Sequence, residues 1–169
     1  MSIATDITIQ EAHKPEEAVS STYIEATKLI ERLHRSLLDV VKDEFDRAGR
    51  SEVNSIQALL LYNIGTRELT AGELRTRGHY LGSNVSYNLK KLVDAGYLHH
   101  ERSDTDRRSV RVRLTEKGLT IHDQIKELYD RHSQSIEQVG GLNMDDFKNL
   151  NDAMQKLERF WGDQIRYRL

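Results

Sequence analysis

The sequence predicts a mainly α-helical protein with a small β-wing, in which a winged helix-turn-helix lobe lies between N- and C-terminal helices. Three observations predict this architecture. Residues 109–114 alternate between apolar and arginine side chains, the pattern of a half-buried strand. Two helical segments, starting near Thr70 and Ser83, are separated by a short turn, as in a helix-turn-helix. Long amphipathic segments lie on both sides of this region.

Composition limits the class of protein. The 169 residues suffice for about one domain, and 37% hydrophobic with 31% charged residues predicts a soluble, helix-rich chain with a core. No apolar run approaches the roughly 18 residues that span a bilayer, and the N-terminus lacks signal-peptide features, so we expect a cytoplasmic protein without membrane association. The absence of cysteine excludes disulfides, cysteine zinc sites and thiol switches.

The charges are segregated along the chain. The net charge is only −2, but residues 67–117 contain 11 Lys or Arg against 7 Asp or Glu, whereas the remainder contains 14 against 20. A basic central lobe between acidic segments suits a protein that binds duplex DNA with that lobe.

The N-terminal segments are predicted to form an arm and a scaffold helix. Residues 1–18 are polar, contain the only proline and predict a loosely docked arm. In the scaffold segment, residues 19–50, an amphipathic helix is expected to begin at Ser20 or Ser21 and to end at Gly49, which suits a left-handed C-cap.

The C-terminal segment, residues 119–169, is predicted to complete two more helices. The first runs from Thr115 to Val139 and ends at Gly140–Gly141, and the second begins at Asn143, three residues before Asp146. The apolar stripes of these outer helices predict that they dimerise with a second copy of the chain. The alternative is that they fold back onto a monomeric core.

Residues 51–118 are predicted to form the winged lobe. A helix is expected from Ser51, as its N-cap, to Gly65. Thr70 and Glu73 then have the spacing of a capping box for a short third helix, which Gly78 ends.

A fourth helix, from a Ser83 N-cap to about Ala95, is the predicted recognition helix, and Gly96 ends it. Val85, Leu89 and Leu92 form its core face, while the other faces carry amide, hydroxyl and ammonium groups that can bind base edges and phosphates. The alternative is an ordinary solvated helix face. The predicted DNA-binding residues of this helix are Ser83, Asn84, Ser86, Tyr87, Lys90 and Lys91.

The strand and the loop before it are predicted to form the wing. Val110, Val112 and Leu114 are expected to face the core, with Arg111 and Arg113 on the opposite face.

At the tip of the wing loop, Arg107 and Arg108 are predicted to reach the minor groove and its flanking phosphates, and the loop's aspartates are predicted to orient them. Arg75 and Arg77 of the third helix are predicted backbone contacts, with plain solvent exposure as the alternative.

From Ser51 to Gly118 the chain resembles the MarR family of winged helix-turn-helix regulators. The motifs that carry the resemblance are Thr70–Leu74, Leu92–Leu98, Asp106–Arg108 and Leu114–Gly118. The resemblance implies a homodimer, and it implies that Arg108, at the arginine of the Asp-x-Arg motif, contacts DNA. In length and N-terminal arm the chain also resembles an alpha-proteobacterial subgroup that controls cell-wall L,D-transpeptidase genes.

Neither a metal site nor a catalytic site is predicted. Consecutive His99 and His100 on a strand point to opposite faces, and His122 and His132 lie almost three helical turns apart, so neither pair is placed to share a metal. The chain has no nucleophile elbow, phosphate loop or metal-spaced His and Glu set, so we expect neither an enzyme nor a cofactor.

The function predicted on these grounds is that of a homodimeric, ligand-responsive repressor that binds a pseudo-palindromic operator in double-stranded DNA. The alternative is a winged-helix module that docks on protein. The resemblance further implies a cleft for a small aromatic or amphipathic effector, and the residues predicted to line it are His34, Leu37, Gln57 and Leu61.

Overall fold

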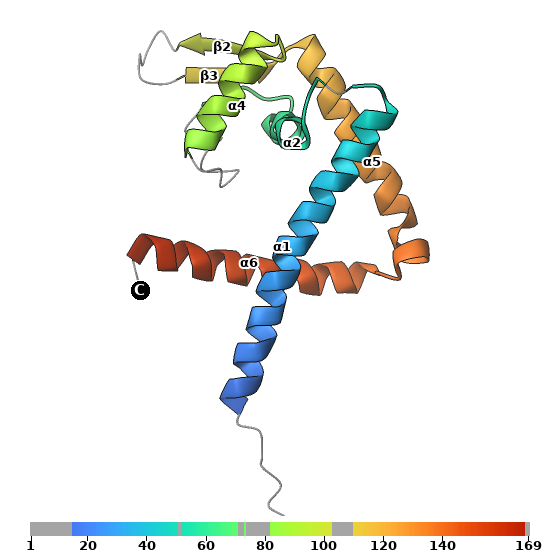
Figure 1. The fold of residues 1–169 in the computed structure, drawn as a ribbon, viewed down its shortest axis with the longest axis vertical. Helices are drawn as coiled ribbons and strands as arrows, with labels where there is room; N and C mark the ends of the chain where they lie inside the picture. The colour runs from blue at the N-terminus through green and yellow to red at the C-terminus, as the bar shows by residue number, and fades with distance from the viewer. Residues whose placement is uncertain (1–14, 51, 71–72, 74–81, 103–109, 168–169) are drawn as a thin grey trace, which may run out of the picture. The chain divides into compact units, whose positions relative to one another are not determined.

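The computed structural model describes residues 15–50, 52–70, 73, 82–102 and 110–167, with side chains except at 15–18, 82–85, 102 and 110. The chain divides into two units, and the boundary falls between Ile56 and Gln57, within α2. The elements drawn in Figure 1 are α1 (Pro15–Arg47), α2 (Ser55–Ile64), β1 (Leu69–Thr70), α4 (Gly82–Asp94), β2 (Leu98–Arg102), β3 (Val110–Leu114), α5 (Glu116–Gly140) and α6 (Met144–Tyr167).

The first unit consists mainly of the long helix α1. The predicted start at Ser20 or Ser21 is wrong, because α1 already begins at Pro15. Proline is favoured in the first helical turn, where its missing N–H would have no partner in any case. Gly49 follows the helix with φ 67°, which confirms the predicted left-handed C-cap. Of the predicted arm, residues 1–14 lie outside the described residues.

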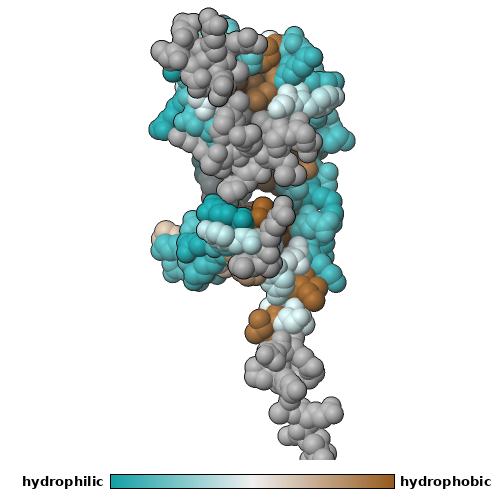
Figure 2. Space-filling model, turned by 90° about the vertical axis from the view of Figure 1, so that its left-hand side faces the viewer, coloured by the Kyte–Doolittle hydropathy of each residue, from teal (hydrophilic) through white to brown (hydrophobic). Residues whose placement is uncertain are grey.

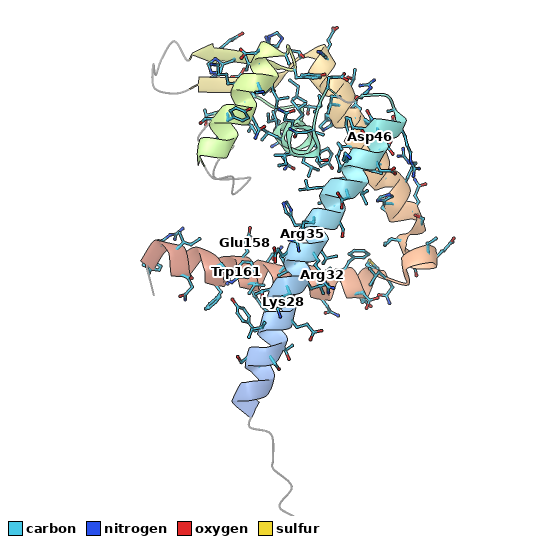
Figure 3. The ribbon with its side chains drawn as sticks, viewed as in Figure 1. Lys28, Arg32, Arg35, Asp46, Glu158 and Trp161 are labelled. Atoms are coloured by element: carbon cyan, nitrogen blue, oxygen red, sulfur yellow. The ribbon has the colours of Figure 1, made fainter. Side chains whose placement is uncertain are left out.

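Much of α1 carries apolar side chains on its surface. Val19, Ile24 and Leu33 are exposed, and Figure 2 shows hydrophobic surface near the N-terminal end of this helix. Charged side chains project between them, among them Arg32 and Arg35 in Figure 3. Towards the other end, Val41 and Phe45 are buried, so the helix changes along its length from exposed to buried apolar residues.

Helix α2 begins at Ser55, so the predicted start with Ser51 as N-cap is wrong. Asn54, another residue type that favours the N-cap, directly precedes the helix, whereas Ser51 lies outside the described residues. The hydroxyl of Ser55 donates a hydrogen bond of 2.8 Å to the carbonyl of Leu38. The helix ends before Gly65, at φ 66°, as the sequence predicts.

The second unit contains a three-stranded antiparallel sheet in the order β1-β3-β2. Val112 and Leu114 of β3 are buried and Arg111 and Arg113 are exposed, which confirms the predicted alternation. Strand β1 was not predicted, because two residues are too few to show a period of two. It places Leu69 opposite Val112.

Two side-chain caps form where the sequence predicts them. The Thr70 amide donates to the Glu73 carboxylate at 2.8 Å, and the Glu73 amide donates to the Thr70 hydroxyl at 3.0 Å. Asn143 and Asp146 exchange equivalent bonds of 2.9 and 3.0 Å before α6. Both capping boxes are confirmed. The remainder of the predicted third helix, including Gly78, lies outside the described residues.

Helices α2, α4 and α5 build the core of the second unit with the sheet. Helix α4 contacts β2, and α5 contacts β3 (Figure 1). An aromatic cluster joins α2 to α5: the Tyr62 ring stacks on His122 at 5.3 Å and meets Tyr129 edge-on at 5.2 Å. The most deeply buried side chains of this unit are Leu60, Leu61, Leu92, Tyr97, Val112, Ile121 and Ile125.

Gly118, in the first turn of α5, packs directly against the backbone of Tyr97. A Cβ at this position would clash with the Tyr97 carbonyl oxygen, a backbone atom that cannot move aside as a side chain can. We therefore expect Gly118→Ala to lower the free energy of unfolding by about 3 kcal/mol, at the upper end of the cost of overpacking. Urea unfolding followed by circular dichroism at fixed protein concentration measures this.

The matched control is Gly162→Ala on α6, where a Cβ meets no atom within 4 Å. There the higher helix propensity of alanine should leave stability unchanged or raise it by up to about 1 kcal/mol. Equal stability of Gly118→Ala and the wild type would contradict the close approach.

Candidate nucleic-acid interface

Helix α4 has the two faces that the sequence predicts. Leu89 and Leu92 are buried, whereas the Tyr87 side chain is 61% exposed and Lys90 and Lys91 are exposed beside it. The predicted N-cap role of Ser83 is wrong, because α4 already begins at Gly82 and Ser83 lies inside its first turn.

Tyr87 and Lys91 form a pair on the exposed side of α4. They are one helical turn apart, and the Lys91 ammonium lies 5.2 Å from the centre of the Tyr87 ring. Ser86 is exposed on the same helix. A hydroxyl, an aromatic ring and two ammonium groups are thereby presented together, which gives the helix donors for phosphate and a ring and hydroxyl for base edges.

The end of α4 is fixed by a Schellman motif. Gly96 is left-handed, with φ 78°, and its amide donates to the Val93 carbonyl at 2.9 Å. The Tyr97 amide donates to the Leu92 carbonyl at 2.8 Å, and both of these side chains are buried. The predicted helix end at Gly96 is confirmed.

Both arginines of β3 form ion pairs with carboxylates. The Arg111 guanidinium lies 2.9 Å from Glu68, just before β1, and that of Arg113 lies 3.7 Å from Glu101 on β2. The charge of these strands is therefore largely neutralised at the sheet surface. Sequence reasoning missed Glu68, because only the pairing of β1 with β3 brings it to Arg111.

Several predicted contact residues lie outside the described residues. They are Arg75 and Arg77 of the third helix, Arg107 and Arg108 of the wing loop, and the side chains of Ser83 and Asn84. Their DNA contacts stay predictions. Strands β2 and β3 do flank the wing loop on both sides, as predicted.

Among the described residues, no three His, Asp or Glu side chains come close enough to hold a metal ion. His99 and His100 are consecutive in β2, and His122 instead lies 3.0 Å from the Asp123 carboxylate while stacking on Tyr62. In the same part of the chain no helix is long and apolar enough to cross a membrane.

The residues predicted to line an effector cleft differ in exposure. His34 and Leu37 are exposed on α1, whereas Gln57 and Leu61 are buried on α2. The first pair belongs to the first unit and the second pair to the second unit. The cleft stays a prediction.

Comparison with known proteins assigns the chain to a family. Residues 53–118 match the model of a winged helix DNA-binding domain. The chain is 36% identical, over 86% of its length and 75% of the relative's, to ExpG, the exopolysaccharide II synthesis transcriptional activator of Rhizobium meliloti. This chain belongs to the MarR family of winged helix-turn-helix transcriptional regulators. Members of the family are DNA-binding regulators, not enzymes.

The fold of this MarR-family chain is shared with solved regulators. A mutant MarR from E. coli complexed with operator DNA matches with a TM-score of 0.66 at 20% identity, covering 80% of this chain and 95% of that one. Streptococcus pneumoniae FabT in complex with DNA matches with a TM-score of 0.62 at 22% identity, covering 83% and 98%. The predicted fold class and family resemblance are confirmed.

The exposed ring of Tyr87 generates a prediction about sequence discrimination. Tyr87→Ala should lower the ratio of operator affinity to random-duplex affinity, because a good base contact discriminates by about 1–3 kcal/mol. Fluorescence anisotropy with both duplexes at one salt concentration measures the ratio. Tyr87→Phe keeps the ring and removes the hydroxyl, so this variant should keep the affinity ratio if the ring makes the contact. Equal weakening on both duplexes would assign base readout to other residues.

Proposed function

We propose that this chain acts as a homodimeric, ligand-responsive transcriptional repressor that binds a pseudo-palindromic operator in double-stranded DNA. Residues 51–118 serve as the DNA-binding lobe, residues 19–50 as a scaffold helix and residues 119–169 as dimerisation helices. The observation that carries the proposal is α4, whose Tyr87, Lys90 and Lys91 lie exposed beside a two-stranded wing. A recognition helix and a wing together can engage neighbouring grooves of one duplex.

The pairing of the strand arginines supports a proposal in which the wing loop and α4 bind phosphate. Arg111 and Arg113 already have carboxylate partners, and each would have to lose an ion pair to bind phosphate. In the proposal, Arg108 at the arginine of the Asp-x-Arg motif contacts phosphate, as the family resemblance implies. Direct base readout then comes from α4 and positioning from the loop.

Arg108→Ala and Arg111→Ala form a matched pair that tests this assignment. Arg108→Ala should weaken binding to operator and random duplex by similar factors and reduce the salt slope by about one unit for each bound protomer. Arg111→Ala removes the same charge and should leave the slope unchanged, since its guanidinium is paired with Glu68. Titrations at four salt concentrations give both slopes. An unchanged slope for Arg108→Ala, or a reduced one for Arg111→Ala, would overturn the assignment.

The apolar surfaces of the outer helices support the homodimer. In α6, all of which the structure describes, no side chain is fully buried, although the helix carries Leu150, Met154 and Phe160. On α1, Leu33 and Leu37 are likewise exposed. Apolar stripes of this extent are expected to be shielded from water, and a second copy of the chain can shield the stripe on each helix.

A chain that ends at Gly141 should therefore lose its dimer. It lacks all of α6, including Phe160 and Trp161, and it should sediment as a monomer or aggregate with little operator affinity. Two half-sites need two recognition helices about 34 Å apart, which a monomer does not supply. A shortened chain that stays dimeric in sedimentation equilibrium would show that the contact is made elsewhere.

The family resemblance also supports the proposal that an aromatic or amphipathic effector binds this chain, with His34, Leu37, Gln57 and Leu61 as the predicted contact residues. The effector would release DNA by favouring a dimer with wrongly spaced recognition helices, to the extent of its differential affinity for the two states. With no cysteine in the chain, release would be non-covalent. Operator displacement by phenolic and other aromatic acids, weakened in Leu37→Trp, is the corresponding measurement.

Transcriptional activation is a second candidate, favoured by the 36% identity to ExpG, itself an activator. A reporter fused to the bound promoter separates the two: deletion of the gene raises expression under a repressor and lowers it under an activator. Control of L,D-transpeptidase genes stays a prediction. A winged-helix module that docks on protein is the outcome if no duplex is bound.

A further inference from the structure

The turn that follows α4 is held by the start of α5. Three consecutive carbonyls, those of Ala95, Gly96 and Tyr97, accept hydrogen bonds from Thr115 and Lys117. The Lys117 ammonium donates to Ala95 at 3.0 Å, the Thr115 hydroxyl to Gly96 at 2.7 Å, and the Thr115 amide to Tyr97 at 3.1 Å. The Ala95 carbonyl, at the C-cap of α4, lacks a partner within the helix, and Lys117 of α5 supplies one.

Lys117 makes two favourable contacts at this point. Besides its bond to Ala95, its ammonium lies 4.1 Å from the centre of the Tyr97 ring, over the face of a side chain that is only 1% exposed. A cation at the C-terminal end of a helix is also stabilised by the helix dipole. The charge of Lys117 is thus directed at the end of α4 and at the residue that follows its cap.

The remaining contacts leave little freedom at this junction. The Thr115 hydroxyl that bonds Gly96 also accepts the Gly118 amide at 3.1 Å, as the N-cap of α5. Gly118 itself lies against the Tyr97 carbonyl, where no side chain fits. The side chains of Thr115 and Lys117 therefore bridge two backbone segments that are already in contact.

We propose that Lys117 is a positioning residue for DNA recognition, which holds the C-terminal end of α4 on the first turn of α5 and so sets the angle of the recognition helix. This rests on the proposed function, because the angle matters only if α4 reads a duplex. Lys117 need not touch DNA in this role. A direct contact of its ammonium with phosphate is the competing assignment.

Lys117→Met tests the proposal because it removes the ammonium and keeps an unbranched stem. Operator affinity should fall about tenfold, the size expected for one lost charge-assisted hydrogen bond, while random-duplex affinity changes less than about twofold and the salt slope stays unchanged. Lys117→Arg keeps a donor and the charge and should restore most of the operator affinity.

Lys126→Met is the matched control, since it removes one cation from the same helix. Lys126 is paired with Asp130 at 2.6 Å, which raises the pKa of the Lys126 ammonium, and it makes no bond to the α4 end. Its affinities for both duplexes should equal those of the wild type.

Hydrogen exchange without DNA provides a readout that is independent of binding. In Lys117→Met the amides of Ala95, Gly96 and Tyr97, which close the α4 cap, should exchange about tenfold faster, while protection of the α5 core is unchanged. Wild-type exchange at these amides would show that Lys117 does not hold the junction, and the proposal would be wrong.

The binding outcomes separate this proposal from the proposed function. Equal losses on both duplexes with a reduced salt slope would make Lys117 a phosphate contact. Full operator affinity in Lys117→Met would overturn the positioning role alone. If the wild type binds no duplex, the proposed function fails and the positioning role fails with it, even if exchange at the cap responds to the substitution.

Discussion

The close contact between the first turn of α5 and the turn after α4 is the constraint on which the winged lobe depends. Gly118 must lie against the Tyr97 carbonyl, and that approach is possible only without a side chain. It brings the Thr115 amide to the same carbonyl and starts α5 beside the end of α4. The Leu114–Gly118 motif thus connects the sheet to α5 and to the end of α4. Leu114 is buried in the sheet, and Thr115 caps α5. Lys117 and Gly118 contact the residues that follow α4.

In the winged lobe, the arginines of β3 are paired with carboxylates, whereas the lysines of α4 are exposed. On the sheet, Glu68 and Glu101 neutralise the two arginines of β3. On α4, by contrast, Lys90 and Lys91 are exposed next to Tyr87. Exposed ion pairs contribute little stability, so the pairs on the sheet do little to hold the strands together. In the proposed function, their main effect is to keep the two β3 arginines from binding phosphate.

What the sequence predicted correctly was governed by local rules. Thr70 with Glu73 and Asn143 with Asp146 cap helices through bonds that span three residues. Gly49, Gly65 and Gly96 follow helices where the sequence predicts helix ends. The exposed face of α4 and the alternation of β3 follow from helical and strand periodicity in the same way.

The errors and omissions arise where neighbouring residues compete or where distant segments meet. Two N-cap residue types, Ser51 and Asn54, precede α2, and the structure uses the later start. The two residues of β1 show no period, so the Glu68–Arg111 pair was invisible before β1 was seen to join β3. In the sequence, nothing distinguishes Lys117 from an ordinary surface lysine. Only the fold brings the Ala95 carbonyl within 3.0 Å of its ammonium.

In the proposed function, this MarR-family chain binds duplex DNA through phosphate contacts from the wing and α4. Its most direct test is the affinity of the wild-type protein for a random-sequence duplex between 50 and 200 mM salt, conditions chosen because counterion release dominates there. If three basic side chains of each protomer meet phosphate, the logarithm of the binding constant should fall against the logarithm of salt with a slope of about −5. A slope near zero, or no binding at the lowest salt, would contradict DNA binding through phosphate contacts and favour a lobe that docks on protein.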